Sequence, residues 1–282
     1  MMATEITASN VKDSDKIGIL LWSSFLICFL CNIGAGLIST LMSVYLPPVV
    51  QDLTGKTNAG ELGEISAYIQ SLYIAGWAAG GFFWGYISDK TGRVKALALS
   101  VGLFGLFTFL ISMAPSWGYV VLLRLLSGLS VGGILVITPT LLFEIWPAKS
   151  RAVMIGIDSI GFPVGIFSSG LVTVLVSHWR DAFTTGLFLP GLAIIAMFVL
   201  KESGHWREGA RLASPEKATA DDRSNLIKGS LIFGSMLIGL WGMFSWIPTW
   251  VQSLLGTTGG QNERGIAMML IGAGGLAGGF AS

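Results

Sequence analysis

Eight long apolar runs constrain the fold of this chain more than any other feature of its sequence. They lie near residues 18–47, 66–88, 95–113, 118–143, 152–177, 183–200, 227–254 and 263–282. A helix needs roughly 20 apolar residues to cross the hydrocarbon core of a bilayer, and backbone groups in lipid must find hydrogen bonds within their own segment. The runs therefore predict an all-α polytopic protein that lies in a lipid bilayer.

Composition argues against several other classes of protein. Charged residues make up 12% of the chain, against about 25% in soluble domains. The net charge of +1 lacks the basic footprint of a nucleic-acid-binding protein, so we expect no nucleic-acid partner. The two histidines, His178 and His205, fall in different loops, and no cluster of catalytic side chains accompanies them. We expect no enzyme activity, no cofactor and no metal site.

Cys28 and Cys31 form a C-x-x-C pattern inside the first apolar run. This pattern can mark a zinc or redox site. Here it lies at lipid depth without a second pair of ligands, where cysteine behaves as a small hydrophobic residue. We interpret both cysteines as part of an apolar helix.

The distribution of lysine and arginine predicts the orientation of the chain. With the N-terminus inside, thirteen of the 17 basic residues fall in inner segments. The outer segments hold Lys56, Arg180 and Arg264, and Arg124 lies within a helix. Because inner loops of membrane proteins are enriched in basic residues, we expect a cytoplasmic N-terminus. The expected location is the plasma membrane, such as the inner membrane of a bacterium.

A charged stretch at residues 201–226 divides the chain into two unequal parts. A polar linker of this kind is typical of a boundary between structural units. We therefore expect a six-helix half at 1–200, a cytoplasmic linker at 201–226, and the start of a second half at 227–282.

The second part repeats elements of the first. The heptapeptide YLPPVVQ at 45–51 matches WIPTWVQ at 246–252, and AGGF occurs at both 79–82 and 277–280. Parallel repeats are one known design of transporters. On this register the last residue falls inside the eighth helix, so we expect a sequence that is truncated in its second half.

The connection between the second and third runs carries the most specific motif. It reads GYISDKTGRVK from residue 85 to residue 95 and resembles the loop G-x-x-x-D-[RK]-x-G-R-[RK] of the major facilitator superfamily, with valine at the last position. The matching residues are Gly85, Asp89, Lys90, Gly92 and Arg93. We expect the first glycine to let another helix approach and the second to permit a tight turn.

Three further elements resemble the sugar- and organic-acid-porter branch of that superfamily. Glu144 and Arg151 are separated by six residues in the connection after the fourth run, and Trp179-Arg180 precedes the sixth. The stretch KESGHWR at 201–207 is similar to P-E-S-P-R-W, with lysine in place of the first proline. The resemblance implies a fold of two six-helix halves that rock about a central site. This chain would supply a six-helix bundle and the first part of a second bundle.

The charged connections suggest a cytoplasmic gate. We expect Asp89, Arg93, Glu144 and Arg151 to form a network that holds one conformation shut, because partly shielded opposite charges stabilise more than exposed pairs. The alternative is that these loops only anchor the protein to lipid headgroups.

Two ionisable residues lie deeper, Arg124 and Asp158. Such groups at lipid depth usually face a cavity or a partner. We expect them to be too far apart to pair, by roughly 10 Å of depth at a rise of about 1.5 Å per residue, and to act as stations for a substrate anion and a proton. The alternatives are a structural tie to helix carbonyls for Arg124 and a water-reached carboxylate near the inner face for Asp158.

The superfamily lines its substrate site with the first, fourth and seventh helices, among others. The mid-depth polar or aromatic residues on these helices are Asn32, Thr138 and Trp241, and the resemblance implies that they are candidates for substrate or ion coupling. For Trp241 the alternative is packing between helices.

The function implied is secondary active transport of a small polar organic solute by alternating access, with coupling to protons left open. We expect a monomer when the protein is full length. The alternatives are a non-transporting membrane sensor or receptor, and an inactive fragment of a transporter.

Overall fold

The computed structural model describes the chain except for residues 1, 56–58, 205, 207–219, 256–259 and 282. The elements are α1 (Met2–Thr54), α2 (Ala59–Thr91), α3 (Arg93–Ser112), α4 (Trp117–Ile145), α5 (Arg151–Leu175), α6 (Trp179–Phe183), the 3-10 turn η1 (Thr184–Leu187), α7 (Phe188–Val199), α9 (Ala220–Leu255) and α10 (Gln261–Ala281). The described residues contain helices and no strand, which confirms the predicted all-α class.

Seven segments of the described chain are long and apolar enough to cross a membrane. They are Gly18–Thr54, Arg93–Ser112, Trp117–Ile145, Arg151–Leu175, Trp179–Val199, Arg223–Leu255 and Gln261–Ala281. The predicted span at 66–88 is not among them, although α2, with 33 residues, is about 50 Å long at a rise of about 1.5 Å per residue. Glycine, serine and glutamine lower its hydropathy.

Packing places α2 in the bundle nevertheless. It lies along α4, and a side chain added at Gly80 or Gly128 would meet the main chain of Leu129 or Tyr73 on the facing helix. Small residues at such positions let two membrane helices approach closely. Two of the glycines that lower the hydropathy of α2, Gly76 and Gly80, are thus residues that fit it against α4.

Several helices extend beyond their sequence-based bounds, among them α2, which begins at Ala59 instead of 66. The first helix runs over Met2–Thr54 instead of 18–47, since polar residues can continue a helix beyond lipid. The sixth span begins at Trp179 instead of 183 and is interrupted by η1. Helix α9 begins at Ala220, inside the predicted linker, of which residues 205 and 207–219 lie outside the described part of the chain.

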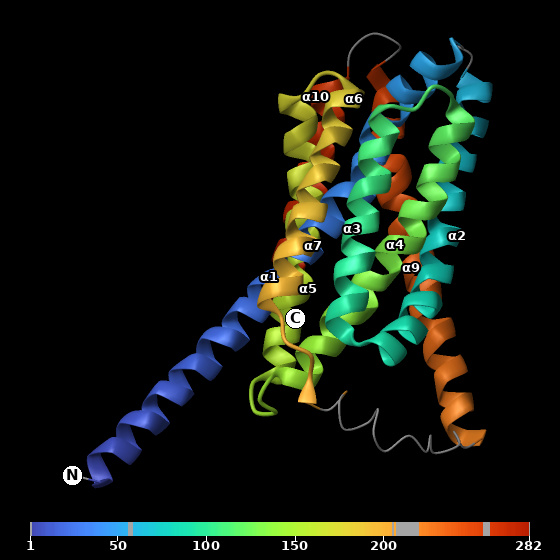
Figure 1. Cartoon of the computed structure of the whole chain (residues 1–282). Helices are drawn as coiled ribbons and strands as arrows, with labels where there is room; N and C mark the ends of the chain where they lie inside the picture. Colours follow the sequence, from blue (N-terminus) through green and yellow to red (C-terminus); the bar gives the residue numbers. More distant parts are fainter. Residues whose placement is uncertain (1, 56–58, 205, 207–219, 256–259, 282) are drawn as a thin grey trace.

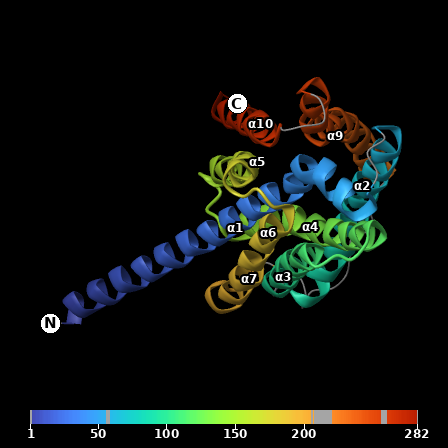
Figure 2. The same cartoon turned by 90° about the horizontal axis from the view of Figure 1, so that it is seen from above.

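The bundle is arranged around α1 and α4. Figure 2 shows these two helices in the middle, with α3 and α7 on one side and α9 and α10 on the other. The pairs that pack together include α1 with α5, α3 with α4 and α7, and α10 with α5. The N-terminus and the α2–α3 and α4–α5 connections all lie at the lower end in Figure 1. The two charged motifs therefore share one face of the protein, here called the inner end, while the division into two halves stays a prediction.

Candidate functional site

A single residue joins α2 to α3 at the inner end. Gly92 has a φ of 106°, in the left-handed region where glycine is strongly favoured. The turn places Asp89, in the last turn of α2, next to Arg93, the first residue of α3. The expected role of Gly92 therefore follows from the geometry. Gly85 is different, because nothing lies within 4 Å of the position that a Cβ would take there, and no described helix uses its small size.

Arg93 is the centre of an ionic cluster. Its guanidinium contacts Asp89 Oδ1 at 2.5 Å and Glu144 Oε1 at 3.1 Å, and it donates to Ser88 Oγ at 2.8 Å. The side chains of Arg93 and Glu144 are only 13% and 14% exposed, whereas that of Asp89 is 68% exposed. Because solvent screens exposed pairs, the contact with Glu144 contributes more than the contact with Asp89.

The other basic residues of the predicted gate do not join this cluster. The Arg151 guanidinium lies 4.5 Å from the centre of the Phe143 ring, and its Nε donates to the Trp146 carbonyl oxygen at 3.1 Å. Lys90 lies 4.3 Å above the Tyr86 ring. The expectation that Arg151 belongs to the ionic network is therefore wrong for the described residues. The Arg151 guanidinium contacts an aromatic ring and a carbonyl oxygen where a carboxylate partner was expected.

Glu202, which sequence reasoning left without a role, completes the cluster. Its carboxylate accepts the backbone N–H groups of Arg93 at 2.8 Å, Val94 at 3.0 Å and Lys95 at 3.4 Å. The first N–H groups of a helix have no partner within the helix and form the positive end of its dipole. A carboxylate from 109 residues away along the chain thus caps α3. The sequence signal that could have indicated a role for Glu202 was the similarity of KESGHWR to P-E-S-P-R-W.

The segment after α7 also contacts Glu144 and Asp89. Ser203 Oγ donates to the Glu144 carboxylate, and Trp206 Nε1 donates to the Asp89 carbonyl oxygen at 2.8 Å. We call Asp89, Arg93, Glu144, Glu202 and Ser203 the inner network. Its contacts hold the inner ends of α2, α3 and α4 together. All its members precede α9.

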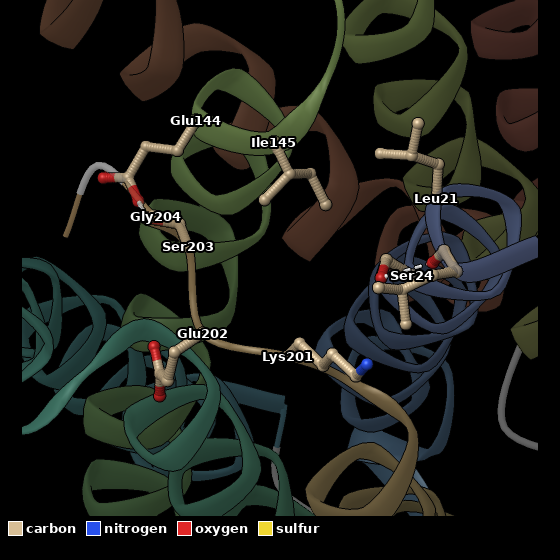
Figure 3. A pocket seen from close by; sticks show the side chains of 9 residues that line it. Leu21, Ser24, Glu144, Ile145, Lys201, Glu202, Ser203 and Gly204 are labelled. Carbon is tan, nitrogen blue, oxygen red and sulfur yellow. Dashed lines mark hydrogen bonds between the residues drawn. The ribbon is translucent and has the colours of Figure 1, made fainter. Parts of the chain in front are cut away.

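A cavity of about 500 Å³ lies beside the inner network (Figure 3). Lys201 and Glu202 point to opposite sides of the segment that lines it. Its lining residues are Leu20, Leu21, Ser24, Glu144, Ile145, Lys201, Glu202, Ser203 and Gly204.

Three of the predicted coupling residues meet in the interior. Asn32 on α1 donates through Nδ2 to Asp158 Oδ2 on α5 at 2.7 Å and to Thr138 Oγ1 on α4 at 3.3 Å. The three residues are 4%, 2% and 0% exposed. Asp158 is therefore buried among three helices, and the alternative of a shallow, water-reached carboxylate does not fit the structure.

Arg124 occupies a second buried polar cluster. It is 0% exposed, its Nη2 donates to Gln70 Oε1 at 3.3 Å, and its guanidinium lies 3.5 Å from the centre of the Tyr73 ring. Gln70 and Tyr73 contact in turn Ser43 and Ser39 on α1. Nε and Nη1 of Arg124 have no hydrogen-bond partner among the described residues. The pattern of α2 gave no hint that Gln70 and Tyr73 would face this arginine.

The two clusters are farther apart than expected. Thr138, which adjoins Asp158 through Asn32, follows Arg124 by 14 residues on α4, or about 21 Å at a rise of about 1.5 Å per residue. The sequence-based figure of roughly 10 Å assumed a helix as long as the hydrocarbon is thick. That assumption was wrong, because α4 has 29 residues and extends beyond it.

Trp241 on α9 packs against aromatic rings of the first part of the chain. Its ring centre lies 4.5 Å from that of Trp77 on α2 and 6.2 Å from that of Phe162 on α5. It is 9% exposed. The structure places Trp241 at a contact between the two parts of the chain, as in the packing alternative.

The bundle, the charged connections at one end and the buried ionisable groups together define a polytopic membrane protein of the transporter class. Comparison with known families makes the assignment specific. Residues 25–282 match the Major Facilitator Superfamily. The chain therefore belongs to this superfamily, and the family expected from the sequence motifs is confirmed.

Individual relatives and solved structures agree with this assignment. The chain is 26% identical over 258 residues to the cis,cis-muconate transport protein of Acinetobacter baylyi, and this alignment covers 86% of this chain and 61% of the relative. It is 28% identical over 213 residues to the gallate transporter of Pseudomonas putida, and that alignment covers 74% of this chain and 46% of the relative. The crystal structure of a D-xylose-proton symporter superposes with a TM-score of 0.66 at 16% identity and covers 89% of this chain and 66% of that chain. The chain thus spans about half to two thirds of these proteins, which are transporters and not enzymes.

Proposed function

We propose that the protein, at its full natural length, is a secondary active transporter that moves a small organic anion by alternating access. The superfamily supports the class of activity. The names of the two relatives, which refer to muconate and gallate, support an organic acid as substrate.

The observation that carries the choice of an anion is the state of Arg124. A charged group removed from water costs several kcal/mol unless it is paired, and an ionisable residue at membrane depth usually marks a pathway. The described surroundings offer Arg124 only the Gln70 carbonyl and the face of Tyr73, neither of which carries a full negative charge. A carboxylate on the substrate would supply that charge and accept hydrogen bonds from Nε and Nη1.

Uptake into proteoliposomes tests this proposal. Gallate, cis,cis-muconate and benzoate are compared with their neutral amides and with xylose, for the wild type and for Arg124→Lys and Arg124→Gln. We expect uptake of at least one acid and not of its amide. We expect KM to rise at least tenfold in both variants, because lysine cannot reproduce the planar, bidentate hydrogen bonding of arginine.

The matched control is Arg180→Gln. Arg180 pairs with Asp52 at 3.3 Å on a partly exposed surface, so its loss should leave KM for the acid unchanged. Equal uptake of acid and amide, or a wild-type KM in Arg124→Gln, would overturn the choice of an anion. Binding of an acid without uptake would favour the alternative of a sensor.

The driving ion, the oligomeric state and the orientation in the membrane are part of the same proposal. We propose that protons drive transport, that the protein acts as a monomer, and that the inner end faces the cytoplasm of a bacterial cell. The excess of basic residues in the segments of the inner end supports the orientation. Single cysteines introduced at Lys90 and Asp181, labelled from outside with an impermeant maleimide, test it: we expect labelling at 181 and not at 90.

A further inference from the structure

We infer that Asp158, held by Asn32 and Thr138, is the group that takes up and releases the coupling proton; this inference rests on the proposed transport function. The geometry points to this residue because its carboxyl group is buried and held in one orientation. Only one of its two oxygens has a hydrogen-bond partner among the described residues.

The hydrogen bonds fix one oxygen of Asp158 and leave the other. Oδ2 accepts from Asn32 Nδ2 at 2.7 Å, while the same amide contacts Thr138 Oγ1, which itself donates to the Ile134 carbonyl oxygen at 2.9 Å. Oδ1 is buried and has no partner among the described residues. The carboxyl group is thus held in one orientation with a free position at which a proton can bind.

The surroundings of Asp158 provide no described counter-charge. The titratable side chains that interact with it are the thiols of Cys28 and Cys31 on α1. Helix α4 carries no titratable residue between Arg124 and Glu144, and α10 carries none after Arg264. A buried ionised carboxylate without a cation is costly. Binding one proton removes the charge and supplies an O–H donor.

A proton fits this site better than a metal ion. Calcium takes six to eight oxygen ligands and magnesium near-octahedral coordination, whereas the oxygens brought together here belong to one carboxylate, one amide and one hydroxyl. The described residues also contain no group of three or more histidine, cysteine, aspartate or glutamate side chains able to hold a metal.

The position of Asp158 on α5 can link its charge to movement. Two residues further along α5, Ile160 lies against Gly279 of α10, and Pro163 lies against Gly275. The opposite side of α5 approaches α1, where a side chain added at Gly165 would meet the Ile33 carbonyl. Asp158 therefore lies on a helix that packs against both α1 and α10, so its protonation can bias the packing of α5 against α10.

The distance from Arg124 separates this proton site from the proposed anion site. At about 21 Å along α4, a proton on Asp158 cannot neutralise Arg124 by direct contact. Coupling between proton and anion must then pass through a change in helix arrangement. This differs from a mechanism in which the two charges pair and exchange partners.

Two transport assays on the full-length protein in proteoliposomes test the inference with gallate or cis,cis-muconate as the probe. The first measures accumulation driven by a pH gradient, and the second measures counterflow at equal pH, which needs no net proton movement. We expect Asp158→Asn to lose gradient-driven accumulation at least tenfold while counterflow continues. Asp158→Glu should accumulate substrate with a changed pH profile. Asp181→Asn removes an exposed carboxylate and should behave as the wild type in both assays.

A second variant decides the matter if Asp158→Asn fails to fold. Asn32→Leu keeps the carboxyl group and removes its donor, so we expect coupled transport with a shifted pH profile. Thr40→Val, which removes the buried contact of Thr40 with Ser169 at 2.9 Å between the same two helices, should not shift it. Gradient-driven accumulation in Asp158→Asn, or an unshifted profile in Asn32→Leu, would refute the inference while leaving transport itself intact. If the wild type transports no acid, the proposed function is wrong as well.

Discussion

Two ion pairs share Arg93, and their unequal burial predicts unequal contributions to stability. The pair with Glu144 joins side chains that are 13% and 14% exposed, and the pair with Asp89 has one partner that is 68% exposed. Exposed pairs contribute about 0.2–1 kcal/mol, and hydrogen bonds to shielded charged groups about 1.5–3 kcal/mol. We therefore expect a coupling energy of about 1.5–3 kcal/mol between Arg93 and Glu144, and below about 1 kcal/mol between Arg93 and Asp89.

Double-mutant cycles measure these two energies. The variants are Arg93→Gln, Glu144→Gln and Asp89→Asn with the two corresponding doubles, unfolded by denaturant in mixed micelles. Raising the salt concentration should weaken the Asp89 cycle more, because ions screen exposed charges most. Equal coupling energies in the two cycles, or a larger one for Asp89, would show that burial does not rank these pairs.

Other contacts of the bundle give two further predictions. Glu202→Gln should lower the free energy of unfolding by about 0.3–2 kcal/mol, because a negative charge is removed from the positive end of α3. Denaturation of the variant in micelles measures this loss. An unchanged stability would show that the cap contributes nothing. Gly128→Val should destabilise the α2–α4 contact by about 1–3 kcal/mol through overpacking, whereas Gly156→Val, which meets nothing within 4 Å, should not; equal losses of stability in the two variants would contradict this.

The sequence predicted the parts of the fold that depend on local patterns. Apolar runs located the helices, and the G-x-x-x-D-[RK]-x-G-R motif located the turn at Gly92, because lipid thickness and backbone sterics act within a few residues. Helix ends were less certain, since nothing in hydropathy marks where a helix leaves the lipid. The beginning of α9 at Ala220 is an example.

Contacts between distant segments were predicted only in part. The motifs brought Asp89, Arg93 and Glu144 together correctly, but they could not show that Glu202 would cap α3 or that Arg151 would turn to Phe143. Side-chain partners depend on how whole helices pack, which periodicity does not encode.

The inner network shares with the expected gate one property that matters for mechanism. Its described members all precede α9, so their contacts hold the first part of the chain together as a unit. The described contacts between the two parts include aromatic contacts around Trp241, close packing along α5 and α10, and hydrogen bonds from Gln261 Nε2 to the Thr173 and Val176 carbonyl oxygens. If the parts rock against each other, the aromatic contacts around Trp241 are among those that must rearrange.

Trp241→Ala tests this view of the moving contact. Each aromatic pair stabilises by about 0.5–1.5 kcal/mol beyond its buried area, so losing the contacts with Trp77 and Phe162 should shift the conformational equilibrium by about 1–3 kcal/mol, roughly a 5- to 150-fold change in populations. Spin-label distances between the inner ends of α4 and α9 would report the shift. Trp246→Ala, at a position 40% exposed, is the control. A similar shift in both variants would mean that the rings act through lipid contact, and the aromatic cluster would then not be what holds the two parts together.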